Sequence, residues 1–289
     1  MAAFAIGVDA GATRSRARLR DATGANLAEA QGGAANIHVD FEAAAATLRG
    51  VLAEVLHKAG VRDSAGVAVG LGLAGVNDAS DAKRIAEAFP GFARVRAAND
   101  ASTACIGAHD GADGGLVIAG TGSAAIARVC GTETIVGGRG FALGDDGSGA
   151  RIGLAALRAA TLAHDGLGAE TALTRDVIAA FGGDVVAMVR WARTAKPGEY
   201  GAYAPGVFAR AKEGDAVALG IAREAAAAIE TLARRAAALG ASRVALVGGV
   251  GEALRPYMDA ATEAGLIRPL RDAVDGAILL AGGPAGPAL

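Results

Sequence analysis

One order of strands and glycine turns occurs twice along this chain, and few folds accommodate such a repeat. Residues 4–8 form an apolar run that ends at Asp9 and a glycine turn, and two short segments after the turn are predicted strands. Residues 115–119 form a second apolar run, which is followed by a glycine turn at residues 120–123 and again by two predicted strands. The repeat predicts two related halves, each beginning with adjacent antiparallel strands, with a boundary near residues 105–113.

Helical periodicity follows the strands in both halves. Residues 41–59 carry apolar side chains at intervals of three and four and end at Gly60, which predicts an amphipathic helix. Residues 67–73 predict a buried strand after that helix. The second half carries more helix, and its longest helical segment, residues 215–239, lies between a capping aspartate and a glycine. Strands that alternate with helices in this way place the chain in the α/β class, with mixed sheets flanked by helices.

Glycine is unusually common in this sequence. The chain contains 44 glycines in 289 residues but only 7 prolines, and the glycines follow no collagen-like period. Four glycine-rich turns come directly after apolar segments, at residues 7–13, 120–123, 144–149 and 248–251. Such turns expose backbone N–H groups that suit anions, because glycine lets oxygen atoms approach the chain closely. We therefore expect a nucleotide or another phosphate to bind at these turns.

Composition argues against several classes of protein. With 28 Lys and Arg against 30 Asp and Glu, the net charge of −2 indicates no nucleic-acid partner. The long uncharged stretches fall short of the roughly 18 residues of a membrane span, and the N-terminus lacks the basic start of a signal peptide. Cys105 and Cys130 are too few for a disulfide framework or a thiolate metal cage. A cytoplasmic protein without a membrane partner is expected.

The common nucleotide and hydrolase motifs are absent or misplaced. No lysine follows a glycine, so the Walker loop is missing, and neither a G-x-S-x-G elbow nor a zinc-binding histidine pair occurs. Gly70-x-Gly72-x-x-Gly75 matches the dinucleotide fingerprint in letters, but it does not stand at the first βα turn of its half. A P-loop enzyme, a hydrolase or a dinucleotide-dependent enzyme is therefore not expected.

Carboxylates follow apolar segments at three places, Asp9, Asp100 and Asp145. A phosphoryl-transfer enzyme needs such a set, because one carboxylate holds magnesium while another accepts the proton of the attacking hydroxyl. Alternatively, Asp100 only caps the helix that follows Asn99, since aspartate is a favoured N-cap residue. The residues alone leave both interpretations open.

Taken together, these segments resemble the sugar kinases of the actin, hexokinase and Hsp70 superfamily. The closest resemblance is to the branch of N-acetylglucosamine kinases and bacterial glucosamine kinases, grouped with the BadF/BadG/BcrA/BcrD ATPases. It extends over nearly the whole chain and keeps the order of seven motifs. These are a first phosphate motif at residues 6–13, a sugar loop at 32–36, a strand end at 72–75, a catalytic turn at 99–101, a second phosphate motif at 120–123, a glycine-rich segment at 137–148 and an adenosine motif at 246–250.

The resemblance implies a fold of two RNase H-like, or actin-like ATPase, domains with mixed sheets flanked by helices. ATP would bind in a cleft between the two domains. The N-terminal domain would comprise residues 1–108, and a C-terminal helix at about residues 274–289 would pack back on it. The second domain would comprise residues 109–273.

The resemblance also implies a role for each motif residue. Asp100 would be the general base on the sugar hydroxyl, and Asp9 would bind Mg²⁺, usually through water. The expected ATP-binding residues are Asp9, Gly11, Thr13, Arg14, Thr121, Gly122, Ser123, Gly248 and Gly249. The expected sugar-binding residues are Asn36, Asn99, Asp100, Arg139 and Asp145.

The sequence departs from the pattern of these kinases at three positions. Ala12 stands where relatives have a second glycine, so the backbone there must tolerate a Cβ atom. Arg14 stands where a lysine is common and preserves the charge. Arg139 replaces a tryptophan near the sugar site, which puts the identity of the substrate in doubt. The Arg139 side chain either points to solvent or pairs with a carboxylate, or it suits an acidic amino sugar.

The expected activity is ATP-dependent transfer of the γ-phosphate to the 6-hydroxyl of N-acetylglucosamine or glucosamine. One alternative is a kinase of a muramyl sugar or another hexose. Another is an ATPase of the BadF type, which activates an acyl-CoA dehydratase and holds an iron–sulfur cluster with cysteines at a dimer interface. Cys105 and Cys130 do not show that arrangement. A homodimer is compatible with either activity, because dimers are common among relatives.

Overall fold

The computed structural model describes residues 2–11 and 13–286. Within these ranges the chain forms two compact units, each with a five-stranded sheet. Unit 1 runs to Gly114 and also contains Arg128–Glu133 and the chain from Arg268 onward, whereas unit 2 consists of Gly115–Ala127 and Thr134–Ile267. The domain bounds expected from the sequence, 1–108 and 109–273, stay a prediction.

The sheet of unit 1 is mixed and has the strand order β3-β2-β1-β4-β5. Strand β1 pairs antiparallel with β2 and parallel with β4, and β5 adds parallel to β4. The antiparallel meander predicted for the first forty residues is thus confirmed. The strands are β1 (Phe4–Ala10), β2 (Ser15–Asp21), β3 (Asn26–Gly32), β4 (Val67–Leu73) and β5 (Arg94–Asn99), and the helices are α1 (Phe41–Lys58), η1 (Ser64–Gly66), α2 (Ala79–Glu87), α3 (Asp100–Ala108) and α12 (Ala273–Leu280).

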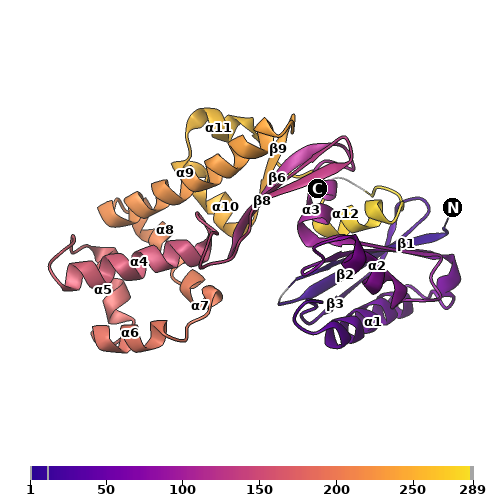
Figure 1. Ribbon diagram of the computed structural model, residues 1–289, viewed down its shortest axis with the longest axis horizontal. Helices are drawn as coiled ribbons and strands as arrows, with labels where there is room; N and C mark the ends of the chain where they lie inside the picture. The colour runs from indigo at the N-terminus through magenta and orange to yellow at the C-terminus, as the bar shows by residue number, and fades with distance from the viewer. Residues whose placement is uncertain (1, 12, 287–289) are drawn as a thin grey trace. The chain divides into compact units, whose positions relative to one another are not determined.

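Helices α1 and α12 cover opposite faces of this sheet, as Figure 1 shows. Side chains alternate between the two faces along a strand. On β1, Ile6 and Val8 therefore pack in one apolar cluster with Leu48 of α1, whereas Gly7 faces α12. Asp40 is the N-cap residue of α1, and its side chain accepts a hydrogen bond from the Ala43 N–H. The helix buries the apolar stripe predicted from its periodicity.

Helix α12 packs closely against the sheet and α3 of unit 1, because glycines at the contacts let the backbones approach one another. A Cβ atom at Gly7, Gly70 or Gly276 would clash with a backbone carbonyl oxygen, and the oxygen that Gly276 faces belongs to Thr103 of α3. The side chain of Thr103 fills the space beside Gly72 in the same way. Gly70 and Gly72 thus serve helix packing, which explains why the dinucleotide-like letters occur here.

The end of α12 corrects one expectation. A helix was expected to about residue 289, but it ends at Leu280 because Gly282 adopts a left-handed conformation and Pro284 follows. The N–H of Gly282 donates to the Leu279 carbonyl and that of Gly283 to the Ile278 carbonyl, which closes the last turn. Residues 287–289 lie outside the described part of the chain.

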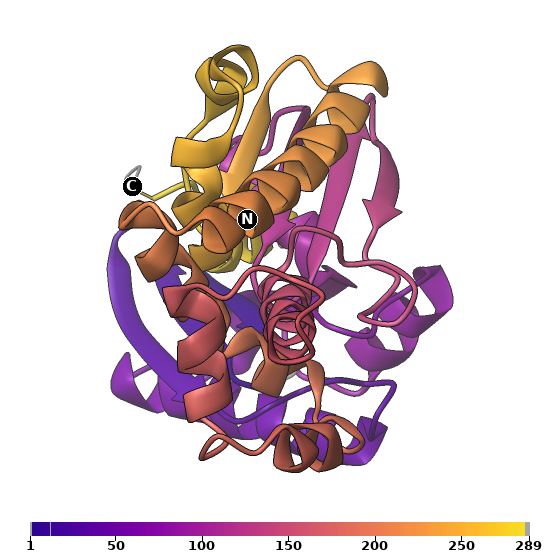
Figure 2. The same cartoon turned by 90° about the vertical axis from the view of Figure 1, so that its left-hand side faces the viewer.

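The sheet of unit 2 has the order β10-β9-β6-β7-β8, in which β9 is parallel to both β6 and β10. Its long helix α9 is orange in Figures 1 and 2 and buries an alanine-rich stripe against the unit 2 core. The strands are β6 (Gly114–Ala119), β7 (Ser123–Val129), β8 (Thr132–Gly137), β9 (Val244–Val247) and β10 (Leu266–Ile267). The helices are α4 (Gly149–His164), α5 (Ala172–Ala179), α6 (Val185–Ala192), α7 (Pro197–Gly201), α8 (Ala204–Lys212), α9 (Ala216–Ala238), α10 (Gly249–Leu254), η2 (Arg255–Tyr257) and α11 (Ala260–Gly265).

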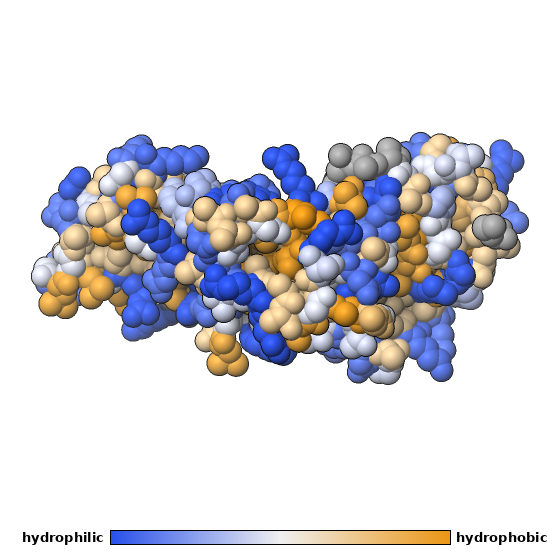
Figure 3. Space-filling view, turned by 90° about the horizontal axis from the view of Figure 1, so that it is seen from above, coloured by the Kyte–Doolittle hydropathy of each residue, from blue (hydrophilic) through white to orange (hydrophobic). Residues whose placement is uncertain are grey.

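Across residues 2–11 and 13–286, none of the helices is both long and apolar enough to cross a bilayer. On the face drawn in Figure 3, hydrophilic and apolar residues are interspersed.

Candidate functional site

The parallel strands of unit 1 bring two predicted carboxylates to one edge of the sheet. Strands β1, β4 and β5 run in the same direction, so their carboxyl ends meet at that edge. Asp9 is the second-last residue of β1, and Asp100 directly follows β5 as the first residue of α3. The two side chains are close enough for the charge of Asp9 to raise the pKa of Asp100. Asp9, the expected Mg²⁺ ligand, and Asp100, the expected general base, therefore lie at the same edge of the sheet.

Asn99, and not Asp100, is the N-cap residue of α3. The Asn99 Oδ1 atom accepts a hydrogen bond of 2.9 Å from the Ala101 N–H, and its Nδ2 atom donates to the Val76 carbonyl at 3.0 Å. Each end of the Asn99 amide therefore has one partner within unit 1, which uses one of its two N–H groups and one of the two oxygen lone pairs. Asp100 is therefore not the N-cap residue of α3, although its carboxylate accepts a hydrogen bond from the same Ala101 N–H.

Asp100 is a half-buried carboxyl group at the start of a helix. Its Oδ1 atom accepts a hydrogen bond of 2.8 Å from the Ala101 N–H. Burial raises its pKa above the ordinary value of an aspartate, and the charge of Asp9 adds to this effect, while the Ala101 hydrogen bond opposes it. A carboxyl group with a raised pKa at a sheet edge is a better proton acceptor than a solvated one.

The predicted sugar loop lies beside the end of β4. The Asn36 Oδ1 atom accepts a hydrogen bond of 3.0 Å from the His38 N–H. Gly75 follows β4 with a φ of 93°, and a Cβ atom there would lie 2.6 Å from that same Oδ1. The Val76 carbonyl in turn accepts the hydrogen bond from Asn99. Unit 1 therefore brings Asn36 and Asn99 to neighbouring segments.

The first phosphate motif begins within β1, and its Gly11 follows the end of that strand. The Gly11 N–H donates to the Arg14 carbonyl, and the Ala35 N–H donates to the Gly11 carbonyl, which ties the sugar loop to this turn. Thr13 and Arg14 have exposed side chains. The expectation about Ala12 falls on a residue outside the described ranges.

In unit 2 the second phosphate motif supports the start of α4. The Gly149 N–H donates to the Gly120 carbonyl at 2.8 Å, and the Ala150 N–H donates to the Thr121 carbonyl at 3.3 Å. Ser123 is buried, and its hydroxyl donates to the Asp146 carbonyl at 2.8 Å, so this hydroxyl fixes the loop in the structure. Thr121 is exposed. The Arg151 N–H donates to the Ser148 hydroxyl, so the first three backbone N–H groups of α4 are already paired within unit 2.

Asp145 lies against this turn in a strained conformation. Its φ is 60°, which non-glycine residues rarely adopt, and its Oδ1 atom accepts a hydrogen bond of 3.2 Å from the Gly140 N–H. A Cβ atom at Gly122 would lie 2.9 Å from the Asp145 Oδ2 atom, so only glycine leaves room for the carboxylate. The structure thus brings together Gly122 and Asp145 across the two glycine-rich motifs of unit 2.

Arg139 lies in the same small loop as Asp145. The loop closes through a hydrogen bond from the Gly144 N–H to the Gly140 carbonyl, and Arg139 is exposed. Sequence reasoning missed Leu143 in this loop, whose side chain is 87% exposed, although a large apolar residue in a glycine-rich turn was a usable signal. It also missed Val39 beside the sugar loop, which is 82% exposed.

The adenosine motif follows β9 directly. Gly248 has a φ of 102°, and a Cβ atom there would clash with the Ala119 carbonyl at the end of β6. Only glycine fits this close approach of two strand ends. Gly249 begins α10, and both glycines are exposed. The end of β6, the start of α4 and the start of α10 are therefore neighbours within unit 2.

Asp9 and Asp100 could supply one or two of the ligands of a magnesium ion. Among the described residues, no group of three or more His, Cys, Asp or Glu is placed to hold a metal ion. Proteins commonly bind Mg²⁺ through one or two carboxylates, with water and substrate phosphates completing the shell. Asp9 and Asp100 at one sheet edge fit that arrangement.

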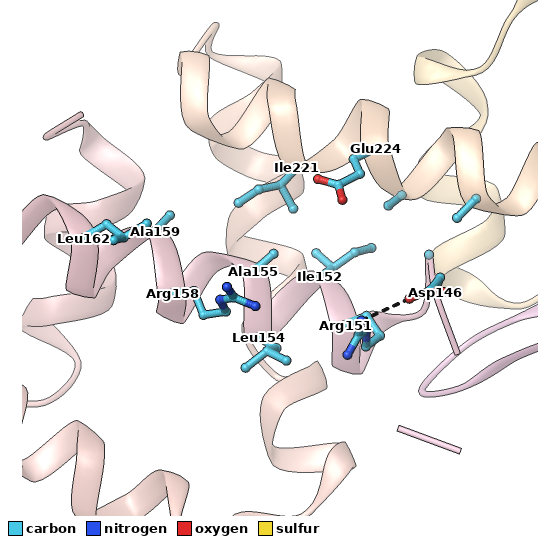
Figure 4. Close-up of a pocket in the computed structure, with 13 residues that line it drawn as sticks. Asp146, Arg151, Ile152, Leu154, Ala155, Arg158, Ala159, Leu162, Ile221 and Glu224 are labelled. Carbon is cyan, nitrogen blue, oxygen red and sulfur yellow. Dashed lines mark ion pairs between the residues drawn. The ribbon is translucent and has the colours of Figure 1, made fainter. Parts of the chain in front are cut away.

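A separate pocket of about 660 Å³ opens between α4 and α9 of unit 2 (Figure 4). Arg158 from α4 and Glu224 from α9 lie on its walls, and Arg151 forms an ion pair of 3.2 Å with Asp146 at one end. None of the predicted site residues lines this pocket. The predicted site consists instead of turns at the carboxyl ends of strands, where substrates bind in many α/β proteins.

A known protein family and a known relative match nearly the whole chain. A sequence model of the BadF/BadG/BcrA/BcrD ATPase family matches residues 6–281. The chain is similar to the glucosamine kinase GspK of Vibrio cholerae, with 34% identity over 283 residues that cover 97% of this chain and 96% of that protein.

Two solved structures are similar in fold. One is named "Putative N-acetylglucosamine Kinase from Chromobacterium violaceum"; it has 35% identity and a TM-score of 0.87, covering 96% of this chain and 98% of that one. The other is a ROK family glucokinase from Streptomyces griseus, with 17% identity and a TM-score of 0.55 over 96% of this chain and 97% of that one. The predicted class of two actin-like units with mixed sheets is confirmed. With a match over residues 6–281, the chain belongs to the BadF/BadG/BcrA/BcrD ATPase family.

Proposed function

We propose that this protein is an ATP-dependent kinase that phosphorylates the 6-hydroxyl of an amino sugar, N-acetylglucosamine or glucosamine. The observation that carries the proposal is the Asp100 carboxyl group, which is half-buried at the same sheet edge as Asp9 and is not the N-cap residue of its own helix. A group in this setting suits a general base. The similarity over the full chain to a glucosamine kinase supports an amino sugar as the substrate.

In the proposed reaction, Asp100 accepts the proton of the sugar 6-hydroxyl. The freed oxygen bonds to the γ-phosphorus of ATP, the bond from that phosphorus to the β–γ bridging oxygen breaks, and ADP leaves with the bridging oxygen. In this loose transition state, position matters more than base strength. The hydrogen bond from Ala101 to the Asp100 carboxylate fixes that position.

The other predicted residues would bind and orient the two substrates. Asn36 and Asn99 of unit 1 and Asp145 of unit 2 would hydrogen-bond sugar hydroxyls. The glycine turns would donate backbone N–H groups to the phosphates, and Gly248 and Gly249 would lie against the adenosine. Mg²⁺, when bound by Asp9 through water, would neutralise negative charge on the phosphates.

The iron–sulfur alternative fits the cysteines poorly. Cys105 is fully buried, and burial raises the pKa of its thiol to about 12, so it resists the thiolate form that a cluster ligand needs. Cys130 is exposed and lies in a different segment. We therefore favour the kinase over the dehydratase activator.

The substrate is tested by measuring ADP release with glucosamine, N-acetylglucosamine, N-acetylmannosamine, N-acetylmuramic acid and glucose. We expect glucosamine or N-acetylglucosamine to raise ADP release at least about tenfold above the rate without sugar. Preference for N-acetylmuramic acid would instead assign Arg139 to a substrate carboxylate. If none of the sugars raises the rate, the kinase proposal is wrong.

The raised pKa of Asp100 predicts the pH dependence of the reaction. A general base must be deprotonated, so kcat/KM falls as the pH drops through this pKa. Because burial and Asp9 raise the pKa, we expect the acid limb of the profile above the ordinary range of an aspartate. The check is kcat/KM for the sugar at saturating ATP across the stable pH range. A rate that stays constant down to the ordinary aspartate pKa would contradict the assignment.

A further inference from the structure

Three arginines on β2 face the same side of the unit 1 sheet. Arg16, Arg18 and Arg20 alternate with apolar residues along the strand, so their side chains share one face. Arg18 contacts Asp272 at 3.1 Å and Asp275 at 2.5 Å, and Arg20 contacts Asp275 at 2.7 Å. Arg20 and Asp275 are buried. These two arginines therefore secure the N-terminal end of α12 to the sheet.

Arg16 differs from the other two because it points to the predicted site. It stands directly opposite Asp9 in the β1–β2 register, and its Nη2 atom donates to the Asp9 Oδ2 atom at 2.9 Å. Its Nη1 atom lies 4.0 Å from Asp272, at the outer limit of an ion pair. Its Nε atom is buried without a hydrogen-bond partner among the described residues. Most of the interaction of Arg16 is therefore with Asp9.

Folding stability does not account for this pair. The side chains of Arg16 and Asp9 are 37% and 25% exposed, and ion pairs with such access to water add little to stability. Arg18 makes more and closer contacts with α12. Arg16 is partly exposed to water and donates a hydrogen bond to Asp9, so a role in the predicted site explains it better than a role in stability.

We propose that Arg16 is a positioning residue that fixes the Asp9 carboxylate and offsets its charge toward a bound nucleotide. The hydrogen bond holds Oδ2, and none of the described residues hydrogen-bonds Oδ1, which leaves that oxygen for a water or a ligand. The Arg16 cation also reduces the repulsion between Asp9 and the ATP phosphates. This inference rests on the proposed function, because that function places Asp9 at the phosphates.

The two parts of the role predict different effects of Arg16→Gln. Without the cation, Asp9 repels the phosphates more strongly, so the Kd for ATP in EDTA should rise roughly fivefold. With Mg²⁺ present, the bound cation screens this repulsion, and the Kd for ATP should rise by less than about twofold. Loss of the fixed orientation should lower kcat roughly tenfold, the usual effect of removing a partner of a metal-binding group. The KM for the sugar should stay within about twofold.

Isothermal titration calorimetry of ATP, with Mg²⁺ and with EDTA, measures the predicted changes in the Kd for ATP directly. Arg18→Gln is the matched control, since it removes an arginine from the same face of β2 with closer contacts to α12. It should lower the Tm but leave both Kd values unchanged. Arg16→Lys keeps the charge and should restore binding in EDTA, while recovering only part of kcat because the planar guanidinium is lost.

The proposal is overturned if Arg16→Gln leaves both the Kd in EDTA and kcat within twofold of the wild type. It is also overturned if Arg18→Gln weakens ATP binding as much as Arg16→Gln, because the effect would then come from general structure. Failure of the kinase proposal is seen separately, as no sugar-dependent turnover in the wild type. In that case the calorimetric comparison still decides the role of Arg16.

Discussion

Asp100→Asn should lower kcat about a thousandfold and leave the KM values for sugar and ATP within about threefold. A positioned general base contributes roughly 10²- to 10⁴-fold to a rate, and asparagine keeps the shape of the side chain but cannot accept the proton. The substitution should not destabilise the fold. Burial raises the pKa of Asp100, so the ionised carboxylate costs stability at neutral pH and a neutral amide removes that cost. Steady-state kinetics and thermal unfolding at pH 7.5 measure both effects.

Asp78→Asn supplies the matched control. Asp78 also stands at the start of a helix, where it caps α2, and its side chain is exposed. Asparagine is an equally good N-cap, so activity should stay unchanged. Hydrogen bonds from Asp81 and Ser80 lower the pKa of Asp78, so loss of its charge should lower the Tm slightly. If Asp100→Asn keeps the activity of the wild type, Asp100 is not the base, even if the protein proves to be a kinase.

Gly276→Ala should be among the most destabilising methyl additions in unit 1. A Cβ atom at Gly276 would clash with the backbone carbonyl of Thr103, which no rotamer change can move away. Overpacking of this kind costs about 3 kcal/mol. In a protein of this size, that corresponds to a decrease in Tm of roughly 6–12 °C. Thermal unfolding followed by circular dichroism gives the value.

Gly220→Ala tests whether the clash, and not the loss of a glycine, causes that effect. Gly220 lies inside α9 with no atom within 4 Å of its added Cβ. Alanine there should stabilise the helix by about 0.5–1 kcal/mol, because glycine is unfavourable in helix interiors. Equal Tm values for the two variants would contradict the packing described for α12.

The main elements of the fold could be predicted because their signals are local. Residues 67–73 form β4 as expected, and the longest helix spans Ala216–Ala238, close to the predicted 215–239. Helices α7 and α11 were not predicted, because such short segments show no clear periodicity. Gly70 makes room for a helix that begins at Ala273, and Gly72 makes room for the Thr103 side chain of α3; no local pattern reveals such contacts.

The site was predicted less completely, because it too depends on contacts between segments that are distant in the sequence. The motifs indicated Asp100 and Asp145, but the sequence could not decide which of two adjacent residues caps α3. Ser123 was expected to bind the nucleotide, whereas the structure shows its hydroxyl donating to the Asp146 carbonyl; a role in nucleotide binding stays a prediction. Arg16 escaped notice because its importance comes from the β1–β2 register, which sets it opposite Asp9.

The fate of the γ-phosphate is the most direct test of the proposed reaction. ATP labelled with ³²P in the γ-position is incubated with the protein, Mg²⁺ and either glucosamine or N-acetylglucosamine, and the products are separated. We predict that the label moves to a sugar phosphate in proportion to the ADP released, and that Asp100→Asn abolishes this transfer. Label that collects only as inorganic phosphate, at the same rate with and without sugar, would contradict the account.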